Sequence, residues 1–148
     1  MSETFHSLFT GFPYAYGTDS GGCAWVSVTS EVIERHLDGK EMIGIYPMVY
    51  DPNKEHHGTA GFITGSDQRP VYQDMRPNLW KCKWGAVDID EGDDSIVYGE
   101  NVSTILQALD ITGWVEVSRS KGCHVWVFTE DWVESSVMRK ALRAAVQM

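Results

Sequence analysis

The sequence contains few cysteines, and their spacing excludes two common structural roles. Cys23, Cys82 and Cys123 are the three cysteines of the chain, and no Cys-x-x-Cys pair occurs. An odd number without that spacing argues against a disulfide framework and against a four-cysteine zinc site. We therefore expect free thiols that are mostly buried, because an unpaired cysteine behaves as a small apolar side chain.

Long apolar runs are also missing. No stretch of about 18 apolar residues occurs, so no membrane-spanning helix is predicted. The N-terminal segment lacks a basic region followed by an apolar one, so no secretory signal is expected. We expect a soluble, cytoplasmic protein with no membrane partner. The 148 residues, 43% of them hydrophobic, are enough for one domain with its own core.

Basic residues are scarce. Lys and Arg together number 12 against 21 Asp and Glu, which gives a formal net charge of −9. Nucleic acids are held largely through their phosphates, so this sign opposes a protein that binds DNA by charge alone. Eight of the 12 basic residues lie from Arg76 onward, which leaves room for a local basic face.

Apolar periodicity predicts an α/β (α+β) fold, in which a mixed sheet is flanked by helices. Residues 1–22 are expected to be irregular. Helices are expected over 30–37 with Thr29 as N-cap and Gly39 as stop, around 101–109, and from Asp131, where Glu134 completes a capping-box spacing. Strands are expected over 23–28, 42–50, 80–90, 114–120 and 124–130, with a further hairpin through 61–64 and 70–73.

Two carboxylates end the apolar run in the segment WGAVDIDEGD, residues 84–93. Strand side chains alternate, so Asp88 and Asp90 should share one face while Ile89 points into the core. Paired carboxylate oxygens are ligands that Mg²⁺ or Mn²⁺ prefers. The segment therefore predicts a site for one of these ions. The acids that follow, Glu91, Asp93 and Asp94, are interpreted as loop residues.

A polar turn joins two predicted strands in the segment WVEVSRSKGCHVWVF, residues 114–128. Ser118 and Ser120 share one strand face and offer hydroxyls, and Lys121 adds a point charge. Gly122 allows a phosphate to approach the backbone, and the imidazole of His124 follows. This set of groups suits a triphosphate.

The neighbours of these groups have other expected roles. Arg119 alternates away from the serines and is expected to face outward, toward a template. A catalytic pair of Cys123 and His124 is disfavoured, because adjacent strand residues point to opposite faces.

Together the two segments resemble the catalytic core of the archaeo-eukaryotic primase superfamily, the primase-polymerases. The similarity is to the type found in phage and mobile-element replication proteins and in TOTE conflict systems. The segment RHLDGKEMIGIYPMVYD, residues 35–51, is similar to the lead-in of that family, and about 32–146 follow the family order. By resemblance, residues 1–148 form one primase-polymerase-like domain. It would have an N-terminal unit of about 1–77 and a motif-bearing unit of about 78–148 with an RNA-recognition-motif-like sheet.

The resemblance implies an enzyme, a DNA-directed primase or polymerase that transfers nucleotides from nucleoside triphosphates with two divalent metals. Asp88 and Asp90 would bind metal, and His124 would contact the phosphates of the incoming nucleotide. The turn that precedes His124 would help to hold the triphosphate through Ser118, Arg119, Ser120, Lys121 and Gly122. Relatives of this type are expected to have glycine where Lys121 stands, so this turn departs from the pattern.

The family has a third metal-binding carboxylate, on a strand after the helix that follows the histidine. The sequence through Met148 contains no such strand, so we expect an incomplete core that is poorly active or inactive alone. A partner polypeptide is expected to supply the third motif. The other expected partners are nucleoside triphosphates, a single-stranded DNA template and a replicative helicase.

Two other functions fit the same residues. One is a non-catalytic nucleotide- or DNA-binding subunit of a replication complex. The other is a metal-dependent phosphoesterase using Asp88, Asp90 and His124. The phosphoesterase fits less well, because the serine-rich turn is better explained by a triphosphate than by a simple ester.

Overall fold

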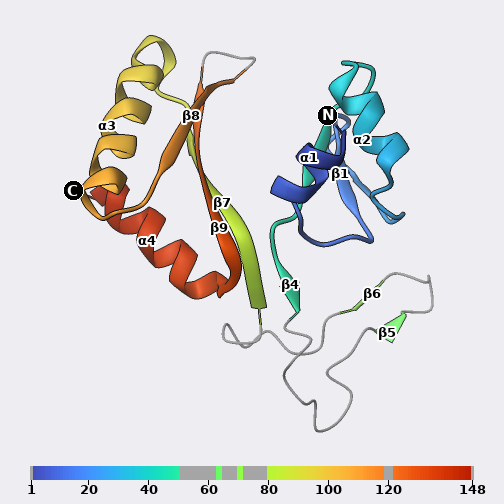
Figure 1. The fold of residues 1–148 in the computed structure, drawn as a ribbon. Helices are drawn as coiled ribbons and strands as arrows, with labels where there is room; N and C mark the ends of the chain where they lie inside the picture. The colour runs from blue at the N-terminus through green and yellow to red at the C-terminus, as the bar shows by residue number, and fades with distance from the viewer. Residues whose placement is uncertain (1, 51–62, 65–69, 72–79, 119–121, 148) are drawn as a thin grey trace, which may run out of the picture. The chain divides into compact units, whose positions relative to one another are not determined.

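The computed structural model describes residues 2–50, 63–64, 70–71, 80–118 and 122–147 (Figure 1). The chain divides into two compact units, Met1–Cys82 and Lys83–Met148. Helices and antiparallel strands occur in both, so the predicted α+β class is confirmed. Within the described residues, no helix has the length and apolarity needed to cross a bilayer.

The N-terminal unit packs two helices with a small antiparallel sheet of order β2-β1-β3. The helices are α1 (Ser2–Leu8) and α2 (Ser30–Leu37), and the strands are β1 (Tyr16–Thr18), β2 (Cys23–Ala24) and β3 (Ile43–Ile45). The prediction that residues 1–22 are irregular was wrong for α1 and for β1, and the strand predicted over 23–28 extends only over β2. The Phe5 ring of α1 lies 4.6 Å from that of Phe9, one turn further on, and makes a tertiary contact with the ring of His36 at 5.7 Å.

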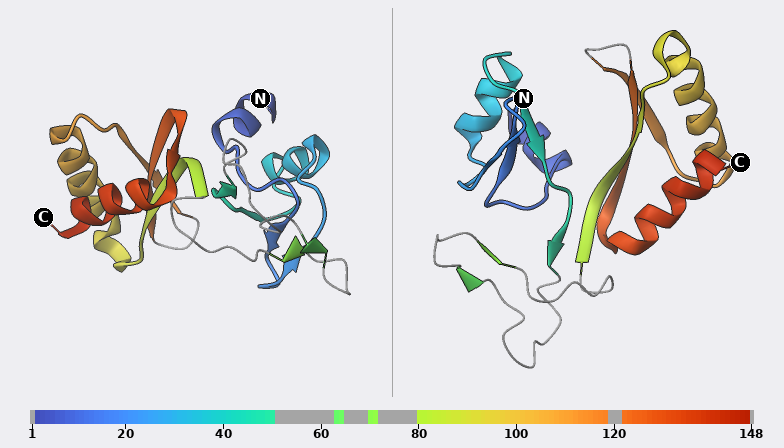
Figure 2. Two further views of the ribbon diagram at one scale, coloured as in Figure 1. Left: turned by 90° about the horizontal axis from the view of Figure 1, so that it is seen from below. Right: turned by 180° about the vertical axis from the view of Figure 1, so that it is seen from behind.

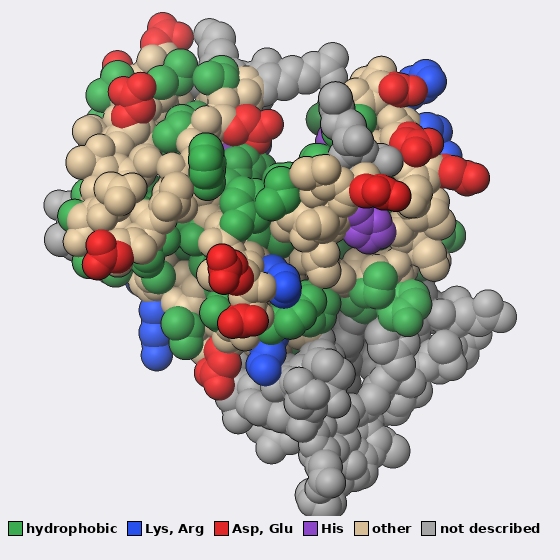
Figure 3. Space-filling model, viewed as in Figure 1, with side chains coloured by type: hydrophobic (Ala, Val, Ile, Leu, Met, Phe, Trp, Pro, Cys, Tyr) green, Lys and Arg blue, Asp and Glu red, His purple; other side chains and the backbone are tan. Residues whose placement is uncertain are grey.

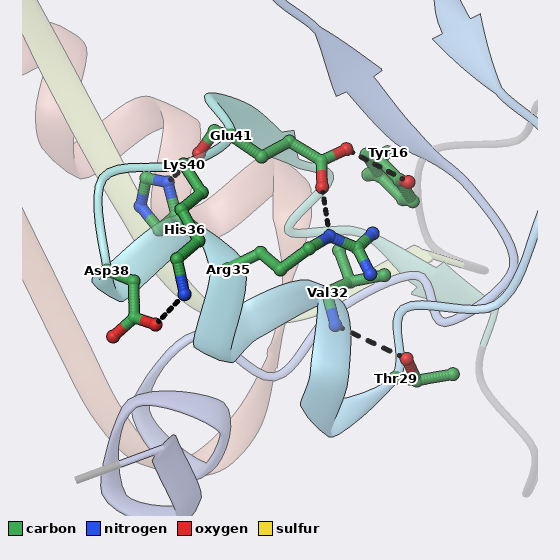
Figure 4. A network of polar contacts seen from close by, with 8 residues as sticks. All are labelled: Tyr16, Thr29, Val32, Arg35, His36, Asp38, Lys40 and Glu41. Atoms are coloured by element: carbon green, nitrogen blue, oxygen red, sulfur yellow. Dashed lines mark hydrogen bonds and ion pairs between the residues drawn. The ribbon is translucent and has the colours of Figure 1, made fainter.

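Helix α2 begins and ends as predicted. The hydroxyl of Thr29 accepts a hydrogen bond from the N–H of Val32 at 3.4 Å, and Gly39 has a φ of 70°. Beyond it, Glu41 accepts hydrogen bonds from Arg35 Nε at 2.8 Å and from the Tyr16 hydroxyl at 3.3 Å (Figure 4). The bond to Glu41 raises the pKa of Arg35. The contacts of Arg35, Tyr16 and Glu41 therefore stabilise the N-terminal unit.

The strand predicted over 42–50 is divided in the structure. Its first part is β3, which pairs with β1, and its last part is β4 (Val49–Tyr50), which pairs with the start of β7 (Trp80–Ile89). The carbonyl of Tyr46 accepts a hydrogen bond from the N–H of Phe12 at 2.8 Å, and the next residue, Pro47, has no N–H to donate. This break sends the two parts to different sheets.

The C-terminal unit is built around strands β7, β9 and β8, which are neighbours in that order. In chain order its elements after β7 are a 3₁₀ turn η2 (Gly92–Asp94), α3 (Ser95–Ala108), β8 (Gly113–Val117), β9 (Cys123–Glu134) and α4 (Ser135–Gln147). Strands β8 and β9 are antiparallel.

The hairpin predicted through 61–64 and 70–73 is present as β5 (Ile63–Thr64) and β6 (Pro70–Val71), which pair antiparallel.

Helices α3 and α4 lie side by side against one face of this sheet (Figures 1 and 2). The residues of β9 that face them are buried, namely Cys123, Val125 and Val127. Glycine residues let both helices approach the sheet closely. A Cβ on Gly99 of α3 would lie 2.5 Å from the Cys123 sulfur, and a Cβ on Gly85 of β7 would lie 2.9 Å from Leu142 of α4. The opposite face of the sheet carries the alternate side chains of β7, β8 and β9.

Two predicted helix boundaries were wrong. Helix α3 begins at Ser95, before the expected start near Asn101, and α4 begins at Ser135 rather than at Asp131. Residues 131–134 continue β9 because side chains tie this strand to β7. The hydroxyl of Thr129 donates to the Lys83 carbonyl at 3.1 Å, and Lys83 Nζ lies 5.7 Å from the ring centre of Trp132.

Candidate functional site

Asp88 of β7 and His124 of β9 lie opposite each other on the face of the sheet that α3 and α4 leave uncovered. Gly122 lies against Ile89 and Asp90, while Thr129 contacts Lys83, so the two strands run antiparallel. The carboxylate of Asp88 is 3.5 Å from His124 Nε2. Asp88 is 67% exposed, whereas Ile89 is 9% exposed. The alternation expected along this strand end is therefore present.

Asp90 lies against the turn that precedes His124. A Cβ on Gly122 would be 2.6 Å from Asp90 Oδ1 and 2.7 Å from the Ile89 carbonyl. Only glycine leaves room for this approach, because the Ile89 carbonyl is backbone and cannot rotate away. The sequence assigned Gly122 to a phosphate contact, but its close neighbours are the end of β7 and the Asp90 carboxylate. Gly122 thus joins the two motif segments.

The turn closes on itself through backbone and hydroxyl contacts. The N–H of Ser118 donates to the Gly122 carbonyl at 2.9 Å, and the N–H of Gly122 donates to the Ser118 hydroxyl at 3.1 Å. Ser118 is thereby fixed near Asp90. Arg119, Ser120 and Lys121 lie outside the described residues, so their proposed contacts with phosphate or template stay predictions.

The sequence reasoning missed Glu116. This residue pairs with His124 across β8 and β9, and its Oε2 lies 3.2 Å from His124 Nδ1. The same oxygen accepts a hydrogen bond from Trp126 Nε1 at 2.6 Å. Asp88, His124 and Glu116 therefore form a row across three neighbouring strands. If the turn between the two predicted strands is centred on Ser120, Glu116 and His124 each lie four residues from its centre and pair with each other. That symmetry in the sequence could have identified Glu116.

Cys123 takes no part in this row. It is fully buried on the helix-facing side, and its thiol donates to the Ser95 carbonyl at 2.9 Å. Burial raises the pKa of this thiol. A nucleophilic Cys123–His124 pair is thus opposed by both geometry and protonation, as the alternation predicted. Cys82 is also buried and Cys23 is exposed, so the expectation of free, mostly buried thiols is confirmed.

The donor set at the end of β7 suits a hard divalent cation. Asp88 and Asp90 are exposed and offer carboxylate oxygens, and Mg²⁺ is commonly held by one or two carboxylates together with waters and substrate phosphates. Across the described part of the chain, no group of three or more His, Cys, Asp or Glu side chains is arranged to hold a metal ion. The two aspartates therefore fit a cation that takes its other ligands from elsewhere.

On one face of the described residues, surface charge does not mark a broad nucleic-acid interface. On the face shown in Figure 3, acidic side chains are spread over the described surface, and Lys and Arg lie among them rather than in one continuous patch. Phosphate contacts through a basic surface are the main source of nonspecific affinity for DNA. Strong binding of a long DNA segment is not expected from this face alone.

Fold and site together define a class of protein. It is an α+β domain in which helices cover one face of the sheet and the other face carries acidic side chains and an imidazole. Residues 55–148 match the family model of the archaeo-eukaryotic primase domain of the TOTE conflict system. The match covers more than half of the chain, so the chain belongs to this family, and the resemblance found in the sequence is confirmed. Residues 35–51 lie before the matched region. Comparison with curated proteins gives no match.

The contact between Gly122 and Asp90 gives a testable prediction. We expect Gly122→Ala to lower the free energy of unfolding by about 1–3 kcal/mol, because the added methyl group forces the turn away from β7. We also expect weaker Mn²⁺ binding, since Asp90 must move. Urea unfolding and isothermal titration calorimetry measure the two effects.

Gly22→Ala is the matched control. Its Cβ would meet only the hydroxyls of Thr18 at 3.5 Å and Ser20 at 3.8 Å, so this variant should resemble the wild type. Equal stability and equal Mn²⁺ affinity of both variants would contradict the proposed contact.

Proposed function

We propose that this chain is the nucleotide-binding catalytic portion of a template-directed primase or polymerase that uses nucleoside triphosphates. The observation that carries the proposal is the meeting of Asp88, Asp90 and His124 at the adjoining ends of β7 and β9. Family membership supports the reaction class, since it points to a primase of the nucleotidyltransferase type.

Asp88 and Asp90 are proposed to hold Mg²⁺ or Mn²⁺. Primase domains of this superfamily generally use divalent metals. When bound, such ions neutralise phosphate charge and stabilise the attacking and leaving oxygens of a phosphoryl transfer. The two aspartates remain exposed on the strand end, where a nucleotide can reach them.

His124 is proposed to orient the triphosphate. Its Nε2 points toward Asp88. A phosphate oxygen only accepts hydrogen bonds, so Nε2 donates to it in the imidazolium form, in which both ring nitrogens carry hydrogen and Nδ1 donates to Glu116. Gly122 lies beside Asp90 and its N–H donates to the Ser118 hydroxyl, so a hydroxyl and a backbone group lie close to the same place. These contacts bind and align the phosphates relative to the two carboxylates.

Two carboxylates flank this histidine and a third, that of Asp90, lies against Gly122, and their charge sets a condition for binding. Asp88 and Glu116 lie within 3.5 Å of the imidazole, and Asp90 follows two residues after Asp88. A triphosphate placed among them is repelled unless a cation screens the contact. Nucleotide binding should therefore depend on a divalent metal.

The corresponding prediction concerns affinity. We expect a nucleoside triphosphate to bind with Mn²⁺ present and not in EDTA. Asp88→Asn, Asp90→Asn and His124→Ala should each weaken binding by roughly tenfold or more, the range for lost hydrogen bonds and ion contacts with charged groups. Isothermal titration calorimetry measures these affinities.

Two substitutions of the same kind serve as controls. Asp131→Asn changes an exposed acid toward the far end of β9, and His6→Ala changes an exposed imidazole of α1; both should leave affinity unchanged. Binding that is equally tight in EDTA, or that ignores all three site variants, would contradict the proposed site.

We further propose that a partner polypeptide supplies a third carboxylate and that the template is single-stranded DNA. The two-carboxylate donor set of the described residues supports the first point, and the net charge of −9 supports a need for additional DNA-binding surface. The same two observations favour one alternative function, a non-catalytic nucleotide-binding subunit of a replication complex.

Primer synthesis on single-stranded DNA separates these possibilities. We expect the purified 148-residue chain to make little product with nucleoside triphosphates and Mn²⁺, and to become active when the product of a neighbouring reading frame is added. Asp90→Asn should abolish the activity of the mixture. Robust synthesis by the isolated chain would refute the need for a partner and would indicate that Glu91, Asp93 or Asp94 completes the metal site. Nucleotide binding without synthesis in any mixture would favour the non-catalytic subunit.

A further inference from the structure

Glu116 is in contact with the proposed nucleotide site without being part of the primase motifs identified above. It lies on β8, opposite His124 and on the side away from Asp88. We infer that Glu116 is a positioning residue, which fixes the His124 ring so that Nε2 faces the place of the nucleotide's phosphates. This inference rests on the proposed function, since it concerns how the same histidine is prepared for binding.

The hydrogen bond between Glu116 and His124 determines which ring nitrogen faces the site. An ionised carboxylate can only accept hydrogen bonds, so Nδ1, at 3.2 Å, must carry the hydrogen. The partner of one imidazole nitrogen sets the role of the other. With Nδ1 engaged by Glu116, Nε2 is the atom directed at Asp88.

The Glu116 carboxylate is itself held in place. Trp126 Nε1 can only donate, and it reaches the same oxygen at 2.6 Å. The Trp126 ring lies 5.7 Å from the ring of Trp84 and meets the His124 ring edge-on at 5.3 Å. One carboxylate oxygen therefore receives two hydrogen bonds from neighbouring side chains of β9, which limits its rotation.

The same geometry separates Glu116 from the metal ligands. His124 stands between Glu116 and Asp88, and these two acids lie on strands that flank β9. The backbones of two strands with a third between them are about 9–10 Å apart. Glu116 is thus directed at the imidazole and is not a third ligand for a cation at Asp88 and Asp90.

The first test reads the His124 ring directly, without metal or nucleotide. Nitrogen-15 NMR of the full chain at pH about 8, with His124→Ala used to assign the signal, reports which ring nitrogen carries hydrogen. We expect hydrogen on Nδ1 in the wild type, the same in Glu116→Gln, and a shift toward hydrogen on Nε2 alone in Glu116→Ala. A His124 signal that is identical in wild type and Glu116→Ala would overturn the inference.

The second test measures affinity for a nucleoside triphosphate with Mn²⁺. Glu116→Ala should weaken binding roughly threefold to tenfold, the range for one lost hydrogen bond, while Glu116→Gln should restore most of it because its amide oxygen still accepts. In the His124→Ala background, Glu116→Ala should have no further effect. Glu130→Ala, which removes an exposed acid from β9, is the control and should bind like the wild type.

The outcomes distinguish the inference from the function on which it rests. If the wild type binds no nucleotide but its ring signal responds to Glu116→Ala, the proposed function fails and the positioning contact stands. If Glu116→Gln binds as poorly as Glu116→Ala and both lose affinity for Mn²⁺ alone, Glu116 acts as a metal ligand and the inference is wrong.

Discussion

The site depends on one close contact between two segments that are distant in sequence. Gly122 packs against the Ile89 carbonyl and the Asp90 carboxylate, with no space for a side chain. This contact sets the register of β7 and β9 and so places Asp88 3.5 Å from His124. A shift of one residue would turn every alternate side chain to the other face and would separate the carboxylates from the imidazole. The proposed metal ligands and the proposed phosphate contact are thus positioned by a single strand pairing.

The two faces of this sheet have different roles. One packs against the helices, and the other carries the proposed site. Close approach at Gly99 and Gly85 lets α3 and α4 cover one face, where Cys123 and Val125 are fully buried. On the other face, Asp88, His124 and Glu116 of the same strands remain partly or largely exposed. Adjacent positions such as Cys123 and His124 consequently have unrelated roles, one in the core and one in the site. The row from Asp88 through His124 to Glu116 then explains why a cation should be required, because unscreened carboxylates repel phosphate.

Local pattern was enough to predict the α+β class, the ends of α2, the hairpin of β8 and β9, and the opposite orientation of Asp88 and Ile89. These features follow from alternation and capping, which neighbouring residues determine. The features that were missed depend on tertiary contacts. Helix α1 is held by Phe5 against His36, β9 extends through residues 131–134 because Trp132 lies near Lys83, and Glu116 gains its role only through strand pairing. Such contacts leave no periodic signal in the sequence.

The central claim is that the ends of β7 and β9 form one metal-dependent triphosphate site. The most direct measurement is a crystal structure of the chain with Mn²⁺ and a non-hydrolysable nucleoside triphosphate, in which the metal is located by its anomalous scattering. The account predicts an anomalous peak bound by Asp88 and Asp90, with a phosphate oxygen within hydrogen-bonding distance of His124 Nε2. Mn²⁺ held by other acids such as Asp93 and Asp94, or a triphosphate away from His124, would contradict it.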